Sequence, residues 1–166
     1  MPELQLSIQQ GDEAPAPPVD RRQLRRWVAA ALERPAQLTL RFVDSEEGRQ
    51  LNLAFRGRNY PTNVLTFPYG PSDGTLPGAA AGDLPDGGDD LDDDRDWACA
   101  DVVICMPVLA REARDQKKSL RDHLAHLVIH GVLHAQGYDH ELPADAQRME
   151  AREQLLLKRF RIADPY

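Results

Sequence analysis

A chain of 166 residues with 42% hydrophobic and 28% charged residues has the composition of one globular domain. It contains no apolar run long enough to span a bilayer, and two cysteines, Cys99 and Cys105, are too few for a disulfide framework. We interpret them as reduced thiols near a strand. The N-terminal residues lack the basic and apolar regions of a signal peptide, so we expect a cytoplasmic protein with no membrane partner.

The net charge of −7 is concentrated in one segment. Residues 71–97 hold nine Asp and one Arg, a net charge of −8, and subtracting this from the total of −7 leaves +1 for the remainder. The overall charge therefore does not exclude an RNA-binding face. The segment has too few apolar residues to offset the entropy of ordering it, so we expect a mobile acidic loop inserted at about 70–97. A calcium loop opening at Asp90, Asp92 and Asp94 is a weaker alternative, because Arg95 replaces its glycine.

Hydrophobic patterns predict four strands and about five helices along the chain. The strands are predicted at residues 4–8, 37–43, 63–69 and 100–106. Helices are predicted after the caps Asp20, Asp44 and Ser119, from Pro107 to about residue 116, and after Pro143, with the second helix ending near Gly57. Strands and helices alternate in part, so the fold class expected is α/β or α+β, with a small mixed four-stranded sheet in a single domain over 1–166.

The most specific pattern in the chain is His130-Gly-Val-Leu-His134-Ala-Gln-Gly137-Tyr-Asp-His140. On a helix, His130 and His134 lie one turn apart on the same face. Gly137 can adopt the left-handed conformation that ends a helix, and the turn can bring His140 back as a third imidazole. Three neutral imidazoles suit Zn²⁺ and leave a fourth position for water. We therefore predict one zinc ion bound by His130, His134 and His140 on a zincin-like histidine helix.

Other polar side chains near this helix have less certain roles. His126 lies near the same helical stripe, and a fourth ligand would close the position that catalysis needs, so a buried position behind the ligands is favoured. We expect His123 to be partly exposed. Asp139 could orient an imidazole or cap the turn. Lys117 and Lys118 could contact phosphates or remain solvated.

A zinc ion held in this way supports hydrolysis, because it lowers the pKa of its water toward about 7 or polarises a substrate oxygen. Extended zinc peptidases read His-Glu-x-x-His-x-x-Gly-x-x-His, with the Glu as general base. Gly131 stands where that Glu is needed, so a peptidase is the less favoured alternative. Phosphodiester cleavage needs positive charge in its transition state. Arg56 and Arg58, in a turn between a predicted helix and strand, are candidates, although such arginines are more often ordinary exposed loop residues.

The histidine motif resembles the signature of the YbeY family, the bacterial rRNA maturation factors and endoribonucleases. Two further stretches resemble motifs of that family and occur in the family's order along the chain. They are Leu51-Asn-Leu-Ala-Phe-Arg56-Gly-Arg-Asn-Tyr-Pro-Thr-Asn-Val-Leu-Thr-Phe67 and Asp101-Val-Val-Ile-Cys105. The resemblance covers roughly residues 38–160. Ala100 departs from a family glycine, and the acidic segment is longer than the usual connection and could repel RNA.

The resemblance implies a single-strand-specific, zinc-dependent endoribonuclease that acts in 16S rRNA 3′-end maturation and ribosome quality control. It implies that His130, His134 and His140 bind the metal and that Arg56 is catalytic and stabilises the scissile phosphate. Metal-bound water or hydroxide is the expected nucleophile, with attack by the RNA 2′-hydroxyl left open. The implied partners are single-stranded RNA, the small ribosomal subunit and its assembly proteins. The alternative is a ribosome assembly factor that does not cut and whose zinc site is structural.

Overall fold

The computed structural model describes residues 2–69 and 97–166. The acidic loop predicted at 70–97 and the calcium alternative at Asp90, Asp92 and Asp94 lie outside these residues, apart from Trp97. The described elements are β1 (Leu4–Gln10), α1 (Arg21–Ala31), β2 (Ala36–Val43), α2 (Ser45–Arg56), β3 (Val64–Pro68), β4 (Ala98–Cys105), α3 (Met106–Asp115), α4 (Leu120–Ala135) and α5 (Pro143–Arg159). None of these helices has the length and apolar character needed to cross a membrane.

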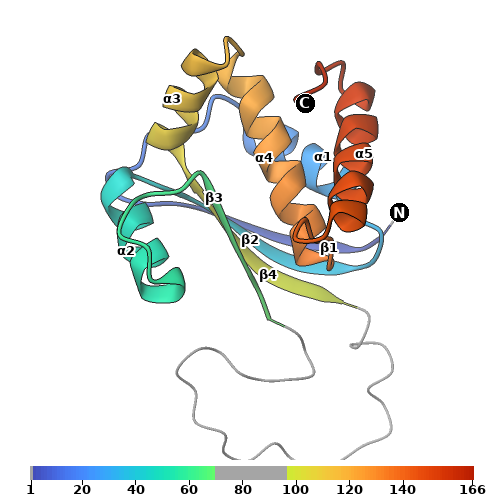
Figure 1. The fold of residues 1–166 in the computed structure, drawn as a ribbon. Coiled ribbons are helices and arrows are strands. Elements are labelled where there is room, and N and C mark those ends of the chain that lie inside the picture. The colour runs from blue at the N-terminus through green and yellow to red at the C-terminus, as the bar shows by residue number, and fades with distance from the viewer. Residues whose placement is uncertain (1, 70–96) are drawn as a thin grey trace, which may run out of the picture.

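The four described strands form one mixed sheet in the order β1-β2-β4-β3 (Figure 1). β1, β2 and β4 run parallel, whereas β3 is antiparallel to β4 and places Thr66 opposite Val102. The predicted fold class, a small α/β domain with a four-stranded mixed sheet and five helices, is therefore confirmed. Cys99 and Cys105 both lie on β4, in agreement with their predicted position near a strand.

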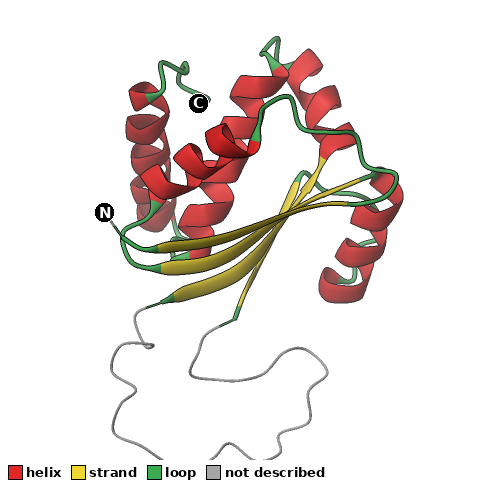
Figure 2. Cartoon of the chain, turned by 180° about the vertical axis from the view of Figure 1, so that it is seen from behind, coloured by secondary structure: helices red, strands yellow, loops and turns green. Residues whose placement is uncertain are grey.

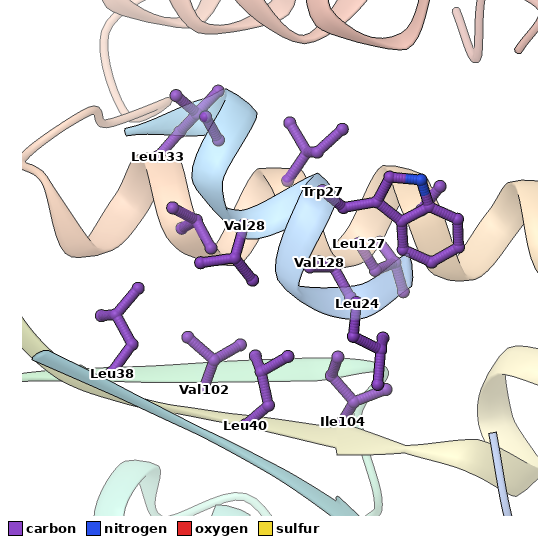
Figure 3. Packing of buried hydrophobic residues seen from close by; sticks show 14 of the residues in the cluster. Leu24, Trp27, Val28, Leu38, Leu40, Val102, Ile104, Leu127, Val128 and Leu133 are labelled. Carbon is purple, nitrogen blue, oxygen red and sulfur yellow. The ribbon is translucent and has the colours of Figure 1, made fainter. Parts of the chain in front are cut away.

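The helices cover the two faces of the sheet unequally (Figure 1; Figure 2). α1 and α4 send apolar side chains toward those of β2 and β4, and together they form the main core (Figure 3). α5 packs against α4. On the opposite face α2 packs over a smaller cluster, made of Val43, Leu65, Val103, Cys105 and Val108. β4 is thus buried on both sides over residues 102–105, its continuous apolar run.

The helix caps predicted from the sequence are confirmed, and one of them sets the position of Arg56. Asp20, Asp44 and Ser119 each accept a hydrogen bond from the backbone N–H three residues further on, at 2.8, 2.8 and 3.1 Å. Gly57 ends α2 in the left-handed conformation, with φ of 69°. As a result, Arg56 is the last residue of α2, at the start of the loop that leads to β3.

α4 is the central helix, in contact with α1, α3, α5 and both β3 and β4. Its close approach to the sheet depends on Gly131, where an added Cβ would lie 2.6 Å from Cγ1 of Val102 and 3.5 Å from Oγ1 of Thr66. The position that carries a glutamate in the peptidase pattern is therefore buried against β3 and β4, with no room for a side chain. This packing brings the C-terminal end of α4 beside the edge strand β3.

Candidate active site

Three imidazoles meet where α4 ends. The ring centroid of His134 lies 4.8 Å from that of His130 and 4.8 Å from that of His140, and the other two centroids are 5.8 Å apart. One ring nitrogen of each histidine lies within 4.8 Å of the corresponding nitrogens of the other two. Zinc–nitrogen bonds are about 2.0–2.1 Å long, so tetrahedral ligand nitrogens are about 3.4 Å apart. The group predicted from sequence is thus assembled, within small side-chain rotations of a metal site.

The turn after α4 carries His140 and is tied to α1. Gly137 has φ of 101°, the left-handed conformation predicted for it. The amide of Gln136 donates to the carbonyl oxygen of Ala31 at 2.8 Å and accepts from the backbone N–H of Glu33 at 2.6 Å. The hydroxyl of Tyr138 donates to the carboxylate of Glu33 at 2.8 Å. These contacts fix the path of the chain that brings the third imidazole back to the helix.

The other polar side chains considered from sequence are also placed. Asp139 caps the turn, since its Oδ1 accepts from the next two backbone N–H groups at 2.6 and 3.2 Å. The prediction that His123 is partly exposed is wrong: it is 3% exposed, and its Nε2 lies 3.0 Å from Oε1 of Glu112. Lys117 and Lys118 line a separate pocket at the N-terminal end of α4, away from the three histidines.

A buried carboxylate that sequence reasoning missed lies behind the histidines. Glu153 of α5 has a side chain with 0% exposure. It pairs with Nδ1 of His130 and accepts from the hydroxyl of Tyr166, and its Oε2 lies 3.3 Å from Nε2 of His126. Burial acts to raise the pKa of this carboxyl, but the hydrogen bonds with His126, His130 and Tyr166 lower it to about 2. One signal was available, because Glu153 shares a helical face with the buried Met149.

This contact determines which nitrogen of His130 is available. A carboxylate beside Nδ1 favours the tautomer in which Nδ1 carries the proton, so Nε2 keeps the lone pair that binds a metal. His126 contacts Glu153 and lies outside the three-histidine group, in agreement with the position behind that group predicted for it. With His130 and Glu153 it forms a second group whose possible ligand atoms lie within 4.8 Å of one another. Burial, with His130 and His140 nearby, lowers the pKa of His134 to about 4, so this imidazole is neutral at neutral pH.

The histidines share a pocket of about 450 Å³ with Arg56. The rest of its lining comes from the loop before β3, from β3 and from the turn after α4, and consists of Thr62, Asn63, Val64, Thr66, Pro68, Gly137, Tyr138 and Asp139. Arg56 is exposed and makes no ion pair within residues 2–69 and 97–166. The arrangement can present a positive charge and three imidazole nitrogens to one bound molecule.

Comparison with known proteins places the chain in a family. A family model described as Endoribonuclease YbeY matches residues 10–161. The chain belongs to the YbeY endoribonuclease family. The endoribonuclease YbeY of Thiobacillus denitrificans is 48% identical over 165 residues, which cover 99% of this chain and 97% of that protein. The endoribonuclease YbeY of Bordetella pertussis is 48% identical over 174 residues, covering 99% of this chain and 96% of that protein.

The solution structure of TM1509 from Thermotoga maritima has a similar fold, with a TM-score of 0.51 and 21% identity, over 96% of this chain and 97% of that one. YbeY membership confirms the family resemblance of the three motifs and the predicted class of enzyme, an endoribonuclease that hydrolyses RNA. Membership of this family does not agree with the peptidase alternative, which was already less favoured because Gly131 replaces the glutamate of the peptidase pattern.

Proposed function

We propose that the chain is a single-strand-specific, zinc-dependent endoribonuclease that acts in the maturation of the 16S rRNA 3′ end and in ribosome quality control. The observation that carries the proposal is the shared pocket of Arg56 with His130, His134 and His140. Family membership supports RNA as the substrate. The ribosomal role, the small-subunit partners and the cytoplasmic location are inferred from the resemblance of the motifs.

The donor set of the pocket fits one zinc ion. The three imidazoles have ring nitrogens within 4.8 Å of one another, and nitrogen donors of this kind suit a borderline-soft cation such as zinc. His134 is already neutral and the tautomer of His130 is fixed, so neither ring has to lose or move a proton to bind the metal. When bound, zinc would supply a Lewis acid and lower the pKa of a coordinated water. Glu153 holds the ring of His130 in place by accepting from its Nδ1, which makes Glu153 a positioning residue.

Arg56 supplies the charge that phosphodiester cleavage requires. Negative charge grows on the non-bridging phosphate oxygens as the nucleophile adds, and a guanidinium can donate two parallel N–H bonds to them. Since Arg56 makes no ion pair in the part of the chain that the structure describes, its donors are available to a phosphate in the pocket. We therefore assign Arg56 to binding the scissile phosphate and stabilising its transition state.

The alternative, an assembly factor with a structural zinc site, calls for a closed set of four ligands. His126 and Glu153, which form a second possible group with His130, do not line the pocket of Arg56, whereas all three members of the three-histidine group do. These two observations favour the enzyme.

The test is cleavage of a short single-stranded RNA by the zinc-loaded chain, beside His134→Ala and the wild type stripped by a chelator. Both should lose cleavage, and adding zinc back should restore only the wild type. Arg22→Ala, at an exposed arginine of α1, is the matched surface control and should cut normally. Equal trace cleavage in every sample would identify a contaminating nuclease and move the assembly factor to first place.

A further inference from the structure

Exposed apolar side chains gather at the end of α2 and in the loop that follows it. Leu53, Phe55 and Tyr60 are 44%, 49% and 49% exposed. They are three of the six large hydrophobic residues that are exposed among those the structure describes. Leu53 and Phe55 are two residues apart on α2 and so point to different sides of the helix, whereas Tyr60 lies in the loop that leads to the pocket.

The same stretch is positively charged in an acidic protein. Residues 48–69 contain three arginines and no Asp or Glu, although the chain has a net charge of −7. Arg49 is neutralised by Glu46, at 2.6 Å. Arg56 and Arg58 have no ion pair in residues 2–69 and 97–166. An apolar surface with unpaired positive charge complements a ligand that has both flat rings and phosphates.

Arg58 and Tyr60 form a pair suited to one nucleotide. Nη1 of Arg58 donates to the hydroxyl of Tyr60 at 3.1 Å, which holds the guanidinium beside the half-exposed ring. An aromatic face stacks on any base, and an adjacent guanidinium can contact a phosphate or stack as well.

The surface is held in place before any ligand binds. The side-chain amide of Asn52, 1% exposed, donates to the carbonyl oxygen of Tyr60 at 2.7 Å. Gly57 turns the chain out of α2 in the left-handed conformation. The ring of Phe55 packs on that of Phe67, with centroids 4.9 Å apart. Little conformational entropy is therefore lost when a ligand docks.

The surface also adjoins the pocket. Arg56 and Thr62 both line the pocket, and Tyr60 is two residues before Thr62. Consecutive Cα atoms are 3.8 Å apart, so the Cα atoms of Tyr60 and Thr62 are separated by about 7 Å or less.

We propose that an aromatic–arginine surface, made of Arg58 and Tyr60, stacks an unpaired base of RNA beside the phosphate bound by Arg56. Tyr60 takes the base, and Arg58 contacts the adjoining phosphate. Bases inside a duplex cannot reach a side chain in this way, so the surface selects single strands. The inference rests on the proposed cleavage of single-stranded RNA and assigns residues to its selectivity.

The test measures binding, which does not depend on cleavage. The dissociation constant of a short fluorescein-labelled single-stranded RNA is determined by anisotropy for the zinc-loaded chain, beside an RNA of equal length with abasic sites at its centre. Tyr60→Ala should weaken binding of the normal RNA by about 5- to 160-fold, the range for loss of one stacked base. Tyr60→Phe keeps the stacking ring and loses only the contact with Arg58, so its loss on the normal RNA should be much smaller than that of Tyr60→Ala. Removing the ring should make no difference to the abasic RNA, which Tyr60→Ala and Tyr60→Phe should bind equally.

Two further variants sharpen the result. Leu155→Ala removes a side chain of equal exposure on α5 and should leave binding unchanged. Arg58→Gln should reduce the slope of log K against log salt by about 0.7, the value for one phosphate of a single strand. Equal binding of both RNAs by wild type and Tyr60→Ala would overturn the proposal, as would an equal loss on both RNAs. Wild type that binds normal RNA more tightly than abasic RNA but does not cut would refute the proposed function and leave the stacking surface intact.

Discussion

Replacing Glu153 by Gln should weaken the proposed zinc site, although the substitution changes none of its predicted ligands. The carboxylate is fully buried and pairs with Nδ1 of His130. Gln has nearly the same volume but no charge, so it accepts more weakly from His130 and turns an NH₂ group toward His126 or Tyr166. Loss of a carboxylate behind a metal-bound histidine typically costs 10- to 100-fold in metal affinity, or about 1.4–2.8 kcal/mol.

The assay is competition for zinc with a chromophoric chelator at neutral pH, with the metal-free unfolding free energy measured in urea on the same samples. We expect the dissociation constant for zinc to rise by about 10- to 100-fold. Glu150→Gln, on the same helix, is the matched control and should leave the constant unchanged. If Glu153→Gln binds zinc as tightly as wild type, the carboxylate does not position His130 and the reasoning is refuted.

Three other variants test the packing around the site. Gly131→Ala should lower the free energy of unfolding in urea by about 1–3 kcal/mol, because its Cβ would overlap Cγ1 of Val102; wild-type stability would contradict the close packing of α4. Asn52→Ala should speed hydrogen exchange in residues 57–63, since it removes the hydrogen bond to the Tyr60 carbonyl; unchanged exchange would show that the loop is held otherwise. Burial lowers the pKa of His123 below its usual 6.5, so the folded chain binds fewer protons there than the unfolded chain. The wild type should therefore lose stability more steeply than His123→Gln as pH falls below 6.5. If the urea midpoints of the two proteins fell equally with pH, protonation of His123 would not be the cause.

Local patterns predicted the parts of the site that depend on neighbours in sequence. His130 and His134 share a helix face because of their spacing, and the left-handed Gly137 follows from the end of that helix. The local sequence made both Arg56 and Arg58 candidates, and the choice of Arg56 came from the family resemblance, since the approach of Arg56 to α4 depends on the order of β4 and β3 in the sheet.

Contacts between distant elements could not be read from these patterns. Glu153 is 23 residues from His130 and meets it only because α5 packs against α4. His123 was expected to be partly exposed, but packing of α3 against α4 buries it. In both cases tertiary packing, and not local preference, decides the environment of a charged or titratable side chain.

The central claim is that Arg56 acts on the phosphate while the histidines hold the metal. It is tested most directly by the single-turnover cleavage rate of a short single-stranded RNA with Arg56→Ala, at saturating protein and with the zinc content measured. We predict a rate lower by about 10²- to 10³-fold, the usual loss when one transition-state donor is removed, with one zinc still bound per chain. A rate equal to that of wild type at full zinc occupancy would contradict the assignment of Arg56.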